Sequence, residues 1–454
     1  MSAIKLFFKS VIPGLLGFVF IAGCSNDDNG SGPMEVASRD FTVTVANISE
    51  ARAFSGSGIF NTPVGASQPG PIGPGGAYEF SFSAAPGSKL SFATMFVPSN
   101  DFFYGTDENG IELFDGSGHQ ISGDMTPMIM LWDAGTEMNQ EPGLGMDQPQ
   151  RQSGPNTGAA DPIDQVRVAP DDFNNLPVVN EVIQVTLTAT APTEFKLRIE
   201  NVSSSTTLHT SDGNSQAVPL APGVWVVHQD AAPIFMENQM DPGDGLEALA
   251  EDGDPGSLFS VLHAETGVTN LLAPGVWAVH STADPLFSAN QPDRGEGLEA
   301  LAEDGNPGML STQIAVRAGV LGSGVFNMPD GSSQPGPLLP GHAYSFSFSA
   351  AAGEYLSFAT MFVQSNDLFY APGGGGIDLF EADGQPISGD VTSLMMLWDA
   401  GTEVNEKPGF GLHQAPRQSA PDSGVDENGN VHLVNDGYSY PANSEVLQVT
   451  ISVQ

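Results

Sequence analysis

The stretch LSFATMFVPSNDFFY, residues 90–104, decides the fold, because it returns almost unchanged as LSFATMFVQSNDLFY at residues 356–370. The segment MLWDAGTE at 130–137 returns in the same way at 396–403, and both segments recur after 266 residues. Self-similarity at a fixed distance is the signature of a repeated structural unit. We therefore expect two copies of one domain.

Each copy has the pattern of half-buried strands. In AYEFSFSA, residues 77–84, aromatic residues alternate with small or polar ones, and AYSFSFSA at 343–350 repeats this alternation. A period of two indicates a strand that buries one face, and the uniformly apolar LSFATMFV is typical of a strand at the centre of a sandwich. The 54 glycines and 35 prolines supply turns. The sequence predicts an all-β protein of two antiparallel β-sandwich domains in tandem.

The first and last strands of the copies suggest their boundaries. EVIQVTLT near the end of the first copy matches EVLQVTIS near the end of the second. The segment FKLRIENVS at 195–203 resembles FTVTVANIS at 41–49, the first strand of the first copy. We therefore place the first sandwich at 39–191 and the second at 194–454.

A shorter repeat lies within the second copy. LAPGVWVVH at 220–228 returns as LAPGVWAVH at 272–280, and GLEALAEDG at 245–253 returns at 297–305, each after 52 residues. We interpret the segment at about 220–314 as a β-rich insertion, duplicated once, in the second sandwich. The Leu and Ala spacing of LEALAED predicts a short helix with an acidic, solvated face.

The N-terminus predicts export. Lys5 and Lys9 precede the apolar run 11–22, which is followed by small residues, and this order is typical of a signal peptide at 1–23. The apolar run is too short to be a permanent membrane span, which takes roughly 20 residues as a helix.

The segment IAGC ends at Cys24, the single cysteine of the chain, and it resembles a lipobox. In a lipobox the cysteine is acylated and the preceding peptide is removed, and several acyl chains anchor a protein stably. Ser25 is typical of sorting to the outer membrane. We expect an exported lipoprotein anchored to the cell envelope, at the outer membrane, with 24–38 as a flexible tether. The alternative is an ordinary signal peptide with an incidental cysteine.

The charge of the chain also restricts its partners. The formal net charge of -41 comes from 54 acidic residues against 13 Lys and Arg. This charge repels nucleic acid and attracts cations. In the simplest alternative, acidity only keeps an exported protein soluble.

The succession FVPSNDFFYG, GIELFD and LWDAGTE resembles the spondin N-terminal domain, also called the F-spondin domain. The resemblance covers about 39–191 and 194–454. It implies a non-enzymatic β-sandwich that binds Ca²⁺ through acidic loop residues and that, in animals, belongs to secreted matrix and adhesion proteins. The cysteine of the animal domain is replaced by Phe114 and Phe380, so the family's disulfide is absent.

Acidic residues in each copy are candidate calcium ligands. Calcium takes six to eight oxygen ligands, often from flexible loops. Asp133 and Glu137 flank a tight Ala-Gly-Thr turn that can aim both carboxylates, with an oxygen of Thr136, at one point. Asp101 follows the LSFATMFV strand and could add a third carboxylate. In the alternative, these carboxylates only cap turns. The corresponding residues of the second copy are Asp367, Asp399 and Glu403.

Other motifs give weaker signals. His228 and His280 each end a repeated strand, which favours a structural role over metal binding. An EF-hand beginning at Asp426 is excluded, because Gly437 stands where the loop needs Glu. No common catalytic motif is visible.

Two functions remain. The first is a calcium-binding, lipid-anchored module that mediates adhesion by engaging an extracellular or periplasmic protein or glycan. The second is a structural envelope protein in which calcium only stabilises the fold.

Overall fold

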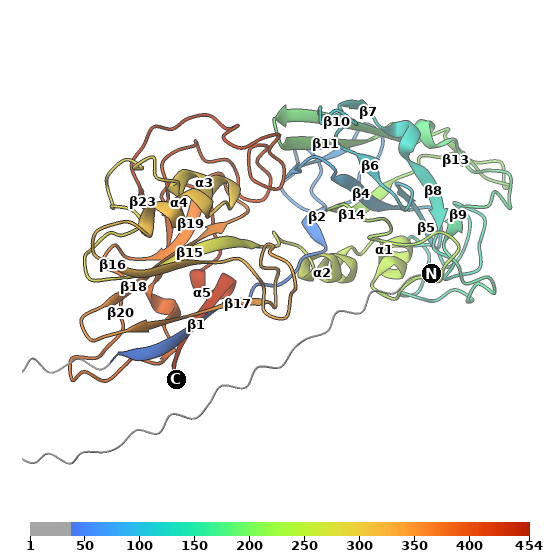
Figure 1. Ribbon diagram of the computed structural model, residues 1–454. Helices are drawn as coiled ribbons and strands as arrows, with labels where there is room; N and C mark the ends of the chain where they lie inside the picture. The colour runs from blue at the N-terminus through green and yellow to red at the C-terminus, as the bar shows by residue number, and fades with distance from the viewer. Residues whose placement is uncertain (1–37) are drawn as a thin grey trace, which may run out of the picture. The chain divides into compact units, whose positions relative to one another are not determined.

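Strands dominate residues 38–454, the part of the chain that the computed structural model describes (Figure 1). They form antiparallel sheets that share buried cores in pairs, which confirms the prediction of an all-β protein with two antiparallel sandwiches. The predicted signal peptide at 1–23, Cys24 and all but the last residue of the tether at 24–38 lie outside the described residues. Within 38–454, no helix is both long and apolar enough to span a membrane.

The first sandwich contains LSFATMFVPSNDFFY. Its smaller sheet has the order β3 (Ala77–Ser83), β11 (Glu194–Asn201), β10 (Ile183–Ala191) and β7 (Gly123–Asp124). Its larger sheet has the order β2 (Phe54–Phe60), β14 (Leu220–His228), β4 (Lys89–Phe96), β5 (Phe102–Gly105), β8 (Met130–Asp133) and β9 (Arg167–Val168), and β6 (Ile111–Glu112) pairs with β4. Aromatic residues such as Phe92 and Phe195 fill the core between the two sheets.

The second sandwich repeats this arrangement. Its smaller sheet has the order β17 (Ala343–Ala350), β1 (Arg39–Asn47), β24 (Leu447–Val453) and β21 (Gly389–Asp390). Its larger sheet has the order β16 (Val320–Phe326), β15 (Leu272–His280), β18 (Tyr355–Phe362), β19 (Leu368–Pro372), β22 (Met395–Asp399) and β23 (His432–Leu433), and β20 (Ile377–Asp378) pairs with β18. The core between these sheets includes Phe41 and Phe358.

A pair of short helices packs on the outer face of each larger sheet. Leucines of α1 (Leu246–Asp252) and α2 (Gly256–Ala264) share a buried cluster with Trp132. The equivalent pair, α3 (Leu298–Asp304) and α4 (Gly308–Ile314), shares one with Trp398. The helices predicted at the two LEALAED segments are therefore confirmed. Their acidic faces are not fully solvated, because Glu251 and Glu303 are buried.

The remaining elements are short. They are β12 (Leu208–His209), β13 (Ser215–Gln216), α5 (Asn443–Val446) and the 3₁₀ turns η1 (Thr126–Met128), η2 (Val179–Glu181) and η3 (Thr392–Leu394).

The strand β1 belongs to the second sandwich, whereas the sequence placed it in the first. It pairs with β17 and β24, so that Phe41 lies opposite Phe348 on one side and Val453 on the other. Figure 1 shows this blue strand beside the orange strand β17. The predicted first domain, 39–191, is therefore wrong in its first strand.

A tight hairpin explains why the two opening strands are exchanged. Only Pro192 and Thr193 separate β10 from β11, and so short a connection makes antiparallel neighbours of the two strands. β11 therefore lies between β10 and β3 of the first sandwich. The segment FKLRIENVS was expected to open the second sandwich, so the predicted boundary between 191 and 194 is also wrong.

The segment at about 220–314 is not an insertion into one sandwich, contrary to the prediction. β14 pairs with β2 and β4 in the first sandwich, and β15 pairs with β16 and β18 in the second. Each larger sheet needs one LAPGVW strand, because without it the strands on either side would have unpaired edges. The repeats are thus shared, one to each sandwich.

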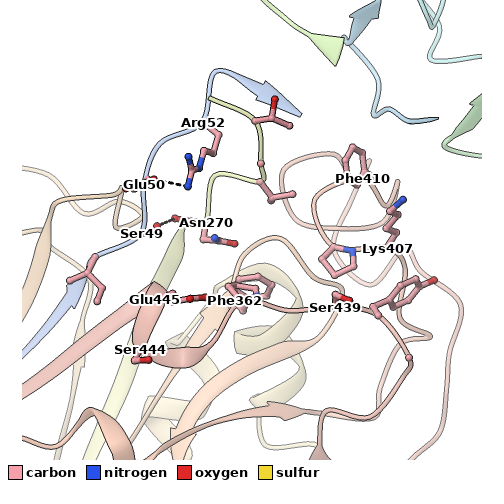
Figure 2. Close-up of a pocket in the computed structure, with 18 residues that line it drawn as sticks. Ser49, Glu50, Arg52, Asn270, Phe362, Lys407, Phe410, Ser439, Ser444 and Glu445 are labelled. Atoms are coloured by element: carbon pink, nitrogen blue, oxygen red, sulfur yellow. Dashed lines mark hydrogen bonds and ion pairs between the residues drawn. The ribbon is translucent and has the colours of Figure 1, made fainter. Parts of the chain in front are cut away.

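The chain crosses from one sandwich to the other at 48–53 and again at 265–271. The two crossover segments are hydrogen-bonded to each other. The Arg52 N–H donates to Thr269 Oγ1 at 2.8 Å, and the Ser49 hydroxyl donates to the Asn270 carbonyl at 3.2 Å. These crossovers line a groove of about 930 Å³, in which Arg52 is paired with Glu50 at 2.5 Å. Figure 2 shows the residues that line this groove.

Candidate metal centre

All six predicted calcium ligands are buried, at the ends of strands in the two larger sheets or in the turns that follow them. In the second sandwich, Asp399 ends β22 and pairs in register with Leu368 of β19. This pairing brings Asp367, the residue before Leu368, beside the D-A-G-T-E turn. Gly401 within the turn has φ of 69°, a conformation that favours glycine. The local sequence therefore shapes the turn, and the sheet register supplies the second segment.

Asp367 is fully enclosed, with 0% of its surface exposed, as Asp101 and Asp133 are in the first sandwich. Its Oδ2 accepts hydrogen bonds from the N–H groups of Thr402 at 2.8 Å and Glu403 at 3.2 Å, and from the Thr402 hydroxyl at 3.1 Å. Its Oδ1 is buried and has no partner among the described residues. Burial, and next the neighbouring Asp399 carboxylate, raises the pKa of Asp367 to about 7. One oxygen of this side chain is thus left for a ligand.

Asp399 stands beside it and is only partly satisfied by turn contacts. Its Oδ1 accepts the Gly401 N–H at 2.7 Å, and its Oδ2 accepts the Asn405 side-chain amide at 2.7 Å. Asp367, Asp399 and Glu427 each place a carboxylate oxygen within 4.8 Å of the other two, and we call them the acidic trio. Asn405 adds a buried Oδ1 without a partner among residues 38–454.

Glu403 is the predicted ligand that the trio does not include. Its Oε1 accepts the Gly424 N–H at 2.6 Å, and its Oε2 accepts the Asn366 amide at 3.3 Å. A Cβ at position 424 would lie 2.1 Å from the Glu403 carboxylate, so a glycine permits this approach. Glu403 holds the 424 loop in place, and Glu427, which sequence reasoning did not identify, stands in the trio instead.

The first sandwich has the same framework around Asp101 and Asp133. The Asp101 Oδ2 accepts the N–H groups of Thr136 and Glu137, both at 3.1 Å, and its Oδ1 is again buried without a partner in the described part. Asp133 accepts the Gly135 N–H at 2.7 Å. Glu137, like Glu403, accepts a glycine N–H. The turn-capping contacts expected in the alternative interpretation are present in both copies.

A guanidinium group distinguishes the first site from the second. Arg167, in register with Asp133 on β9, lies 2.7 Å from Asp133 Oδ2 and 2.5 Å from Asp161 Oδ2. In the second sandwich, His432 stands in register with Asp399, and its Nδ1 contacts the Asn430 carbonyl at 2.9 Å. The first site therefore contains a built-in cation, whereas the second does not have one at that position.

Two tryptophans beside the acidic turns and the two strand-ending histidines have structural surroundings. Trp132 and Trp398 are buried, and each indole N–H donates to a backbone carbonyl. His228 and His280 are buried, and the Nε2 of each lies 2.9 Å from a serine hydroxyl. These contacts confirm the structural interpretation of the two histidines, and they make the tryptophans part of the packed core.

Comparison with known proteins finds no family model that matches the chain and no curated sequence that is similar to it. The resemblance to spondin domains therefore stays an expectation.

Proposed function

We propose that this protein binds Ca²⁺ through Asp367, Asp399 and Glu427 in the second sandwich. One observation carries the proposal: the Asp367 Oδ1 is fully buried, has no partner among the described residues, and lies in a trio of carboxylates. An unpaired buried charge is costly unless a cation or hydrogen bonds compensate it. A bound cation would compensate all three carboxylates at once.

The donor atoms favour calcium. The trio offers carboxylate oxygens, and the Asn405 Oδ1 is a further oxygen whose own amide nitrogen contacts Asp399. Oxygen-only sites on loops suit Ca²⁺, which accepts six to eight such ligands in flexible geometry, with water completing the shell. The ligands come from the β18–β19 turn and from both ends of the β22–β23 connection. Calcium would thereby tie together segments that are far apart in the chain.

In this proposal the protein is a non-enzymatic lipoprotein of the cell envelope, anchored through Cys24. It displays calcium-stabilised sandwiches that engage a protein or glycan, and its net charge of -41 argues against nucleic acid as a partner. The alternative is a structural envelope protein in which calcium only stabilises the fold. The burial of Asp367 and Asp399 favours a stabilising role for the metal, and the exposure of Glu427 keeps the site open to solvent.

Calcium calorimetry on the full-length protein, stripped with chelator, tests the metal site. The wild type should take up Ca²⁺, and Asp399→Asn should take up one equivalent less. Asp133→Asn is the matched control, because Arg167 already compensates that carboxylate, and this variant should match the wild type. A wild type that takes up no calcium at millimolar concentration would show that the site is wrong.

Binding to cells or matrix separates the two functions. If the protein is an interaction module, chelator abolishes binding. If calcium is only structural, chelator lowers the melting temperature and leaves binding unchanged below that temperature.

A further inference from the structure

A second group of acids lies on the helix that covers the larger sheet of the second sandwich. Glu299 and Glu303 are one turn apart on α3, so their side chains lie on the same face of the helix. Asp422, from the β22–β23 connection, joins them, and the three carboxylates each place an oxygen within 4.8 Å of the others. We call these residues the helix cluster. It shares no residue with the acidic trio.

Glu303 is a buried member of the helix cluster whose carboxylate lacks hydrogen-bond partners among the described residues. Only 1% of Glu303 is exposed, and neither of its carboxylate oxygens has a hydrogen-bond partner among the described residues. Burial raises the pKa of Glu303 to about 8; the nearby Thr402 hydroxyl acts in the opposite direction, and the Glu403 carboxylate adds to the rise. The charges that act most strongly on Glu299 are also acidic, and Asp422 is the first of them. The cluster therefore combines enclosed oxygens with a negative field.

The first sandwich shows how the same position is satisfied without a metal. Glu251, the counterpart of Glu303, accepts the Thr136 hydroxyl at 2.7 Å. The counterpart of Asp422 is Asn156, which lies 266 residues earlier in the chain. The Asn156 amide donates to Glu247 Oε1 at 2.8 Å. Each glutamate of the first sandwich thus accepts a hydrogen bond from a side-chain donor.

In the second sandwich these donors are missing or used elsewhere. The side chain of Asp422 has no N–H group that could replace the side-chain amide of Asn156. The Thr402 hydroxyl, counterpart of that of Thr136, donates to Asp367. Neither oxygen of Glu303 accepts a hydrogen bond from the described residues, and Glu303 is buried as Glu251 is. A cation is the partner that three converging carboxylates can share.

We propose that Glu299, Glu303 and Asp422 bind a second divalent cation, separate from the one assigned to the acidic trio. The three donors are all carboxylates, which select a hard cation of the Ca²⁺ or Mg²⁺ class. This cation links α3 to the β22–β23 connection, whose far end supplies Glu427 of the trio. The first sandwich has no such site, because Asn156 supplies an amide in place of the third carboxylate.

The test counts bound metal in the full-length protein by equilibrium dialysis with Ca²⁺ and, in parallel, with Mg²⁺. The wild type should hold one equivalent more of one of these metals than Asp422→Asn or Glu299→Gln. Asp422→Asn introduces the side chain that the first sandwich has at the equivalent position, Asn156. The variant should therefore fold, and circular dichroism checks this. Glu381→Gln is the control, because this exposed acid belongs to neither group, and it should bind as the wild type does.

The variants separate this proposal from that of the acidic trio. If Asp399→Asn loses one equivalent while Asp422→Asn and Glu299→Gln lose none, the helix cluster binds no metal and the trio does. If Asp422→Asn loses one equivalent while Asp399→Asn loses none, the helix cluster stands and the trio fails. A loss of every equivalent in Asp422→Asn would overturn the claim that the two sites are separate.

Discussion

The substitution Phe41→Ala tests the exchange of strands between the sandwiches. Phe41 is fully buried in β1, where its ring stacks on Phe348 with centroids 5.7 Å apart and meets Phe380 edge-on at 5.6 Å. Truncating a buried Phe to Ala costs about 3–5 kcal/mol in the free energy of unfolding. We expect this loss in the second sandwich, although Phe41 precedes the first sandwich in the chain.

The matched substitution is Phe195→Ala in β11, the counterpart of β1. Phe195 is also fully buried, and its ring stacks on Phe82 at 5.6 Å and meets Phe114 edge-on at 5.4 Å. The two phenylalanines occupy equivalent surroundings, so the expected loss is the same. The loss should fall on the first sandwich, although the sequence predicted that β11 opens the second.

Hydrogen exchange with mass spectrometry on the full-length protein locates each loss. Because 1.4 kcal/mol corresponds to a factor of ten, a loss of about 3–5 kcal/mol speeds exchange through opening roughly 100- to 4,000-fold. Phe41→Ala should speed exchange in β17 and β24 and leave β3 and β10 unchanged, and Phe195→Ala should do the reverse. Faster exchange of β3 and β10 in Phe41→Ala, with β17 and β24 unchanged, would refute the strand exchange.

Three further substitutions test individual contacts. Gly324→Ala would place a Cβ 2.8 Å from the indole nitrogen of Trp277, so overpacking should cost about 1–3 kcal/mol in urea denaturation, and unchanged stability would contradict this close approach. Burial lowers the pKa of His228, so below about pH 6.5 the unfolded chain binds a proton that the folded chain does not, and stability falls as the pH falls. His228→Gln should reduce this pH dependence of stability between pH 5 and 7. If stability falls with pH as steeply in the variant as in the wild type, His228 is not its source. Arg167→Gln should destabilise the protein by about 3–5 kcal/mol, because it leaves the buried Asp133 uncompensated, and millimolar Ca²⁺ should restore part of the melting temperature. A variant that melts like the wild type without calcium would disprove the role of Arg167 as a built-in cation.

Much of the local structure could be predicted from the sequence. The alternation in AYEFSFSA and the apolar run LSFATMFV both form the strands expected of them, β3 and β4. The LEALAED segments form helices, and the S-N-D and D-A-G-T-E segments meet at one site in each sandwich. These features depend on short-range periodicity and on a repeat that recurs at a constant distance.

The residues that form the site could be predicted only in part. Glu303 was expected on a solvated helix face, and neither Arg167 nor Glu427 was identified. Helical spacing shows which residues share a face but not what packs against that face. Arg167 and Glu427 lie in a connection that the matched segments do not include. The only motif near Glu427 was the start of an EF-hand-like loop at Asp426, which was excluded, and no motif pointed to Arg167. The only available signal for Arg167 was a basic residue in an acidic chain.

The sequence by itself determined that the protein has two similar sandwiches, which strands they need and where the acids recur. Only the tertiary structure decided which copy of a strand enters which sheet. β1 and β11 have the same alternation of buried and exposed residues, so either one satisfies either core. The two-residue hairpin at Pro192 and Thr193 places β11 in the first sandwich, and β1 then fills the equivalent position in the second. Two strands with the same alternation compete for one position in a sheet. The alternation within each strand does not show which of them takes that position.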